Sequence, residues 1–137
     1  MTSGSESDCD FCGVIANEES AREVLHTKDV VAFFPLEPAT LGHTLLVPRQ
    51  HLPDIWHLVE TTAALLASAT LNLSRAIRDA LSPDGLNIIQ SDGEAATQTV
   101  PHLHVHLVPR WHGDAMGAIW PEQGVGRHLD DTSNDTT

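Results

Sequence analysis

Basic residues, cysteines and long apolar runs are all scarce in this chain of 137 residues. Seven Lys and Arg stand against nineteen Asp and Glu, so the formal net charge is −12. A protein that grips a nucleic-acid backbone or an anionic membrane needs clustered basic side chains. We therefore expect no nucleic-acid partner and no membrane partner. No apolar run approaches the length of a membrane span, and the polar start is unlike a signal peptide, so we expect a cytoplasmic protein.

The length and the uneven charge indicate one domain between two acidic ends. A chain of this size has room for one ordinary domain, and 41% hydrophobic residues are enough for a core. Half of the net negative charge lies in the first ten and last ten residues. We expect a disordered acidic tail over 1–8, a single domain over 9–120 and an acidic tail over 121–137.

The hydrophobic pattern predicts an antiparallel α+β domain. Short apolar runs bounded by Pro or Gly predict strands, and 11–26 has room for one short helix. A long helix is predicted over 58–81, because its apolar residues recur at intervals of three and four. The predicted strands are 30–34, 43–47, 86–90 and 102–110. The predicted apolar face of the helix comprises Leu58, Leu65, Ala69, Leu73, Ala76, Ile77, Ala80 and Leu81.

Histidine, by contrast, is abundant, and its nine copies outnumber Lys and Arg together. In the predicted strand 102–110, His102, His104 and His106 alternate with leucine and valine. Because side chains alternate across a strand, the three imidazoles share one face. The outer two lie roughly 13 Å apart along the strand, so one metal can hold all three only with strain. A catalytic three-histidine zinc and a solvated row of surface histidines both remain open.

The two cysteines, Cys9 and Cys12, have the spacing of a zinc knuckle. They are too few and too close for a secreted disulfide framework. One Cys-x-x-Cys supplies only half of a zinc site, so a redox pair and two free thiols remain alternatives.

Four segments resemble the histidine-triad (HIT) superfamily, and together they cover about residues 9–112. The segment PHLHVHLVPR (101–110) is similar to the signature in which three histidines alternate with apolar residues. VAFFPLEPATLGHTLLVPRQH (31–51) resembles the strand–turn–strand segment, and SDGEAATQTVPH (91–102) resembles the loop before the triad. CDFC (9–12) resembles the N-terminus of the zinc-bearing branch. The resemblance implies the HIT-like α+β fold, with about five antiparallel strands, one long helix and a short N-terminal helix.

The resemblance also implies a chemistry, namely hydrolysis at the α-phosphate of a small nucleotide, as in Hint- and Fhit-like hydrolases. His104 matches the nucleophile, which forms a nucleotidyl-histidine that water then cleaves. His106 and His43 match histidines that contact phosphate oxygens, and Gln98 and Thr99 match the phosphate-holding loop. Expected substrates are nucleoside phosphoramidates or dinucleoside polyphosphates.

Three positions depart from the family pattern. Pro35 stands where an Asp or Asn usually meets the ribose, and Ser91 stands where Asn or Gln precedes the loop. Thr97 replaces a glycine. Phe33 and Phe34 are expected in the core or in the floor of the base pocket. The departures at Pro35 and Ser91 keep open a nucleotide-binding protein with little activity, and a nucleotidyltransferase or phosphorylase of the same superfamily is the other alternative.

The resemblance further implies a structural Zn²⁺ and a dimer. Its ligands are expected to be Cys9, Cys12, His51 and His102, a closed set with no open position for water. If His102 binds zinc, it cannot assist the leaving group. Members of the family commonly form two-fold homodimers, and we expect one here.

Overall fold

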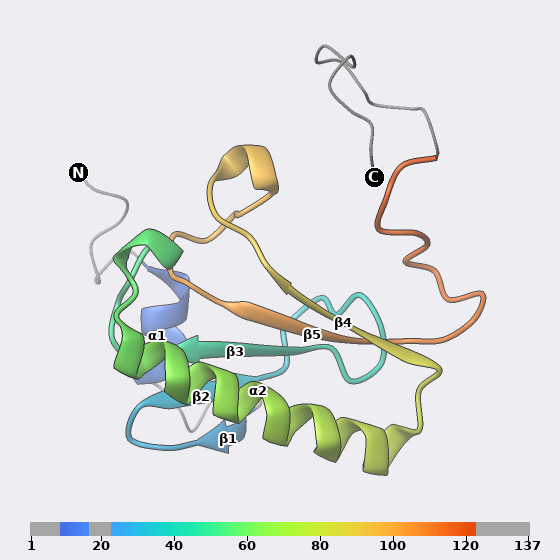
Figure 1. The fold of residues 1–137 in the computed structure, drawn as a ribbon, viewed down its shortest axis with the longest axis horizontal. Helices are drawn as coiled ribbons and strands as arrows, with labels where there is room; N and C mark the ends of the chain where they lie inside the picture. Colours follow the sequence, from blue (N-terminus) through green and yellow to red (C-terminus); the bar gives the residue numbers. More distant parts are fainter. Residues whose placement is uncertain (1–8, 17–22, 123–137) are drawn as a thin grey trace.

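The structure, a computed structural model, describes residues 9–16 and 23–122, which form one five-stranded antiparallel sheet and two α-helices (Figure 1). The strand order is β1-β2-β3-β5-β4, so β1 and β4 are the edges. Within these residues, neither helix has the length and apolar character that a membrane span requires. The elements are α1 (Asp10–Ala16), β1 (Glu23–His26), β2 (Val30–Phe33), β3 (Thr44–Pro48), α2 (Glu60–Leu81), β4 (Gly85–Gln90) and β5 (Val105–Arg110).

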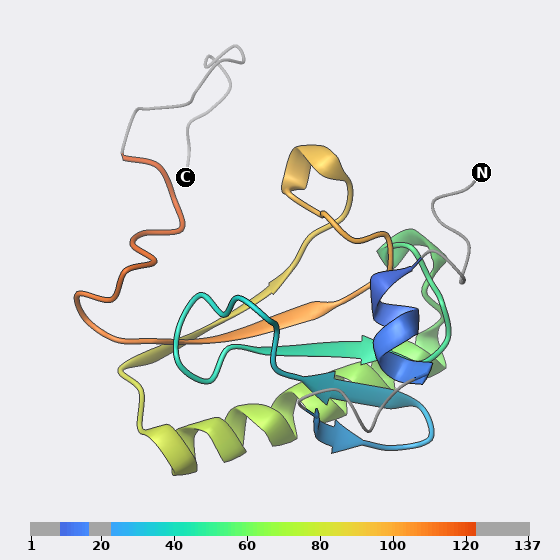
Figure 2. The same cartoon turned by 180° about the vertical axis from the view of Figure 1, so that it is seen from behind.

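The helices cover opposite faces of the sheet, as the two views in Figures 1 and 2 show. On one face, α2 packs its buried residues on alternate residues of the central strands, and this cluster is the main core. On the other face, α1 contributes to a smaller cluster of Cys9, Phe11, Val31, Phe33, Leu45 and Val47. Because β2 and β3 are covered on both sides, all nine of their residues are buried.

The predicted α+β architecture is confirmed, and the long helix is close to its predicted bounds. It begins at Glu60 and ends at Leu81, where Ser82 adopts a left-handed conformation (φ 46°) and Pro83 cannot continue the helix. Its buried residues are Leu66, Ala69, Leu73 and Ile77. The expectation was wrong for Leu65, Ala76 and Ala80, which are exposed; Leu65 is 43% exposed, and its neighbour Leu66 faces the sheet instead.

The predicted last strand is shorter than expected. Strand β5 begins at Val105, so His102, which lies in a bend, and His104 precede it in a segment without regular secondary structure. The alternation nevertheless holds through this segment. Leu103, Val105 and Leu107 pack with the α2 core, whereas the rings of His104 and His106 contact each other on the α1 side.

Residues 11–26 differ from the prediction in one respect. The short helix is present as α1, but Glu23–His26 form the edge strand β1, which pairs with β2. This strand has four residues and no hydrophobic alternation, so the sequence carried no signal for it. The expected tail over 1–8 and all but the first two residues of the expected tail over 121–137 lie outside the described residues.

Candidate active site and metal centre

The imidazole of His104 is buried and held in one orientation. Its side chain lies 2.7 Å (Nδ1) from the carbonyl oxygen of His102. A carbonyl only accepts, so Nδ1 carries the proton and Nε2 of the neutral ring keeps its lone pair. Burial lowers the pKa of His104, although the bond to the His102 carbonyl and the charge of Asp92 act in the opposite direction. The ring therefore offers a neutral nucleophilic nitrogen at pH 7.

A second pair of imidazoles lies beside His104. His43, just before β3, approaches His106 of β5 with 3.0 Å between Nε2 and Nδ1. The rings of His104 and His106 have centroids 4.9 Å apart and meet edge to face. Burial lowers the pKa of His43, and burial together with the neighbouring His104 and His43 lowers the pKa of His106 to about 4. The three rings are thus a cluster of neutral imidazoles without a lysine or arginine among them.

Phe11 packs directly on the nucleophilic ring, and the sequence analysis had assigned it no role. Its ring lies edge to face with His104 at a centroid distance of 4.9 Å and with Phe33 at 5.6 Å. The available signal was its place between Cys9 and Cys12, which ties it to the expected metal site.

Cys9, Cys12, His51 and His102 come together and can hold a metal ion. Their four donor atoms all lie within 4.8 Å of one another. Nδ1 of His102 is 3.4 Å from Sγ of Cys9 and 3.5 Å from Sγ of Cys12, and Nδ1 of His51 is 3.3 Å from Sγ of Cys12. Around a tetrahedral zinc, sulfur and nitrogen ligands are separated by about 3.5 Å. The distances therefore fit this metal.

The hydrogen bond on the far side of His102 supports the same assignment. His102 is fully buried, and its Nε2–H donates to the carbonyl of Pro48 at 2.9 Å. The proton therefore sits on Nε2, and Nδ1 presents its lone pair to the two cysteines, as a metal-binding histidine requires. Among the described residues, no other group of three or more His, Cys, Asp or Glu side chains is gathered in this way. A zinc shared by His102, His104 and His106 is thus not what the geometry favours.

The loop before β5 is held by the side chain of Gln98. Its amide oxygen accepts from the N–H of Gly93 at 2.7 Å, and its NH₂ donates to the carbonyls of Pro53 (2.7 Å) and Val100 (3.0 Å). Gln98 therefore shapes the loop in this structure. Thr97, where the family has glycine, is left-handed with φ 73°, a strained conformation for a β-branched residue.

The other predicted loop and pocket residues have different environments. Within 9–16 and 23–122, the hydroxyl of Thr99 has no hydrogen-bond partner and the side chain is exposed, whereas Ser91 is half-buried. Phe33 belongs to the α1-side cluster with Phe11. Phe34 is 42% exposed and lines an apolar pocket of about 300 Å³ against α2, apart from the histidines.

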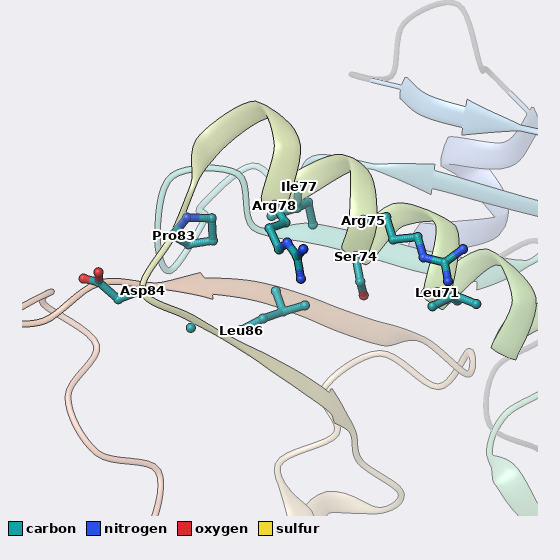
Figure 3. A pocket seen from close by; sticks show the side chains of 9 residues that line it. Leu71, Ser74, Arg75, Ile77, Arg78, Pro83, Asp84 and Leu86 are labelled. Carbon is teal, nitrogen blue, oxygen red and sulfur yellow. The ribbon is translucent and has the colours of Figure 1, made fainter.

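A further pocket, of about 410 Å³, lies between α2 and the beginning of β4 (Figure 3). Leu71, Ile77 and Leu86 line it together with Arg75 and Arg78, whose side chains are exposed. It contains none of the predicted site residues. Of the predicted residues, His104, His106 and Phe33 lie on the α1 side, whereas this pocket lies on the α2 face.

Comparison with known proteins gives one consistent family. The protein-family model described as "HIT domain" matches residues 16–113 of this chain. The protein named "Protein hit" of Bacillus subtilis is 36% identical over 93% of this chain and 88% of its own length. A protein of Schizosaccharomyces pombe, named adenosine 5'-monophosphoramidase hnt1, is 27% identical over 85% of this chain and 86% of its own. The crystal structure of a Zn-bound histidine triad family protein from Mycobacterium smegmatis superposes with a TM-score of 0.75 at 34% identity, covering 82% of each chain.

Proposed function

The chain belongs to the HIT domain family, and on this premise we propose that it hydrolyses a nucleoside phosphoramidate or a dinucleoside polyphosphate at the α-phosphate. The observation that carries the proposal is the free Nε2 lone pair of His104, fixed by the bond from Nδ1–H to the His102 carbonyl. The relative named as a monophosphoramidase supports the substrate class. An activity of this class needs a positioned nucleophile more than a charged one.

The reaction proceeds in two steps. Nε2 of His104 attacks the α-phosphorus, and the bond from phosphorus to the leaving nitrogen or oxygen breaks. The leaving group departs with the bonding electron pair and takes up a proton, and a nucleotidyl-histidine remains. Water then adds to the same phosphorus and releases one proton, the phosphorus–nitrogen bond to His104 breaks, and a nucleoside monophosphate is released. The ring N–H of His106 and the hydroxyl of Thr99 are the donors for the oxygens on which negative charge develops.

The nucleoside is expected beside Phe11, whose ring contacts that of His104, and beside Phe33, whose ring packs on Phe11. Phe34 is less suited to this role because it faces α2. Pro35 offers no side-chain acceptor to the ribose hydroxyls, so a contact there must come from another residue. Among the predicted residues, Ser91 offers a short hydroxyl donor at the start of the loop.

We assign a structural zinc to Cys9, Cys12, His51 and His102. When bound, the ion ties α1 and the segment before β5 together, and the four protein ligands leave no open position for water. It would contribute folding free energy, since the ligands come from three separate segments of the chain. The Zn-bound relative supports this assignment.

A homodimer and a cytoplasmic location complete the proposal. Strand β4 is an edge of the sheet, and Ile88 on it is 52% exposed, as is Leu71 of α2 at 49%. An unprotected edge with apolar side chains is the kind of surface that a second copy covers. Light scattering of the purified chain tests this, and a monomeric mass would contradict it.

The test of the chemistry is the variant His104→Asn, whose amide retains a donor for the His102 carbonyl but lacks Nε2. We expect turnover of an adenosine phosphoramidate and a diadenosine polyphosphate to fall by about 10³-fold or more. The matched control His112→Asn alters an exposed histidine and should keep wild-type turnover. Circular dichroism must show both variants folded.

Three outcomes would change the assignment. Turnover by His104→Asn at the wild-type rate would exclude His104 as the nucleophile. Inorganic phosphate, added to the wild-type assay, distinguishes hydrolysis from phosphorolysis, because a phosphorylase would release nucleoside diphosphate. Calorimetric binding of adenylate without turnover of either probe would show a binding protein instead.

A further inference from the structure

The backbone N–H of Ala39 lies 2.9 Å from Nδ1 of His43. A backbone amide can only donate, so Nδ1 of His43 must carry a lone pair. The proton of this neutral imidazole therefore sits on Nε2. One main-chain group thus decides which of the two tautomers His43 adopts.

The same reasoning applies to the ring of His106. Nε2–H of His43 points at Nδ1 of His106, 3.0 Å away, so Nδ1 of His106 accepts and its own proton sits on Nε2. Both hydrogen bonds therefore point in one direction: Ala39 donates to His43, and His43 donates to His106. The reverse tautomers would set the N–H of Ala39 against an N–H of His43, inside a site where His43 is only 7% exposed.

The position of Ala39 is itself fixed by the loop between β2 and β3, drawn in cyan in Figure 2. The hydroxyl of Thr40 donates to the carbonyl of Pro109 on β5 at 2.6 Å, and the N–H of His43 donates back to the carbonyl of Thr40 at 3.2 Å. Gly42, with φ 83°, makes the turn at the end of the loop, directly before His43. The loop is therefore tied to the strand that carries His106.

We propose that the backbone N–H of Ala39 is a positioning group that sets the tautomers of His43 and His106, so that His106 presents Nε2–H as a donor to the phosphoryl oxygen. The inference rests on the proposed function and deepens it. It makes His106 a hydrogen-bond donor in both steps and excludes it as the base that removes a proton.

The experiment is an amide-to-ester replacement, in which lactic acid is incorporated at position 39 by nonsense suppression. The ester removes the N–H and keeps the methyl side chain. We expect kcat to fall about tenfold with KM little changed, which is the effect of losing one oriented donor in the transition state. The matched control is the same replacement at Ala63, whose N–H donates to the Val59 carbonyl of α2 at 2.9 Å. It removes an equivalent bond far from the histidines and should leave kcat unchanged.

Long-range ¹H–¹⁵N spectra of the histidine rings in the unaltered protein give a second readout, which needs neither a variant nor turnover. We expect both His43 and His106 as Nε2–H tautomers at pH 7, and a mixture of tautomers in the ester at position 39. An Nδ1–H tautomer for either ring in the wild type overturns the inference. So does an ester with unchanged kcat and unchanged spectra.

Failure of the proposed function has a different signature, since wild-type protein would then turn over neither nucleotide probe. The ring spectra would still report the two tautomers in that case. If the ester at position 39 does not fold, the wild-type spectra alone decide.

Discussion

His106 is expected to make the stability of the protein depend on pH between 7 and 5. Its ring is partly buried between His43 and His104, and these surroundings lower its pKa from 6.5 to about 4. The unfolded chain therefore binds a proton more readily than the folded chain. Stability is fully present above the unfolded pKa of about 6.5 and is lost as the pH falls toward 4.

The size of the effect follows from the two pKa values. With 6.5 in the unfolded state and about 4 in the folded state, His106 alone lowers the free energy of unfolding by about 2 kcal/mol between pH 7 and pH 5. The pKa values of His43 and His104 are also lowered, so they add to the loss in the same direction. Most carboxylates remain ionised above pH 5, so their contribution in this window is small.

Urea unfolding at pH 7, 6 and 5 measures this dependence in the wild type and in His106→Asn, whose amide oxygen can still accept from His43. We expect the variant to lose about 2 kcal/mol less than the wild type over this range. The control His112→Asn should retain the wild-type slope, because His112 is exposed. Acid release of a bound metal affects all three proteins alike. Equal slopes for the wild type and His106→Asn would refute the reasoning.

Two further predictions concern the metal and the turn before β3. A chelator, or the substitution Cys12→Ser, is expected to lower the melting temperature by more than 10 °C, because losing the metal or one of its ligands weakens a site that ties separate segments together. Calorimetry with measurement of bound zinc checks this. An unchanged melting temperature in metal-free protein would contradict it. Gly42→Ala should reduce the free energy of unfolding by about 2–4 kcal/mol, because φ is +83° and the added methyl would collide with the side chain of Leu81. The matched variant Gly113→Ala, with φ +79° and open space around it, should lose only about 1–2 kcal/mol in the same urea titration, and equal losses would contradict the collision.

The sequence predicted the parts of the fold that hydrophobic period controls. Helix α2 and the central strands were recognised because their apolar residues recur at fixed intervals. The edge strand β1 was missed, since four residues with three exposed side chains carry no such period. The choice between Leu65 and Leu66 was wrong for a related reason: both are leucines, and only the angle at which α2 crosses the sheet decides between them.

The candidate site was predictable in its residues but not in its connections. The resemblance named four residues from three separate segments of the sequence, and the structure brings their donor atoms within 4.8 Å of one another. It did not indicate that Gln98 is engaged by the loop, or that the main chain at Ala39 contacts His43. Both are hydrogen bonds to or from backbone groups, which every residue possesses, so no residue type marks them in a sequence.

His102 links the candidate metal site to the proposed nucleophile through two different atoms. Its Nδ1 points at the two cysteines, whereas its carbonyl oxygen accepts from Nδ1–H of His104. A displacement of His102 would therefore move the group that holds the His104 ring in its tautomer. Phe11 makes a second link, because it stands between the cysteines and its ring packs on His104. The net charge of −12 is compatible with a phosphate ligand, because the proposed site does not depend on clustered lysine or arginine. The phosphate oxygens would instead meet neutral imidazoles that these hydrogen bonds hold in place.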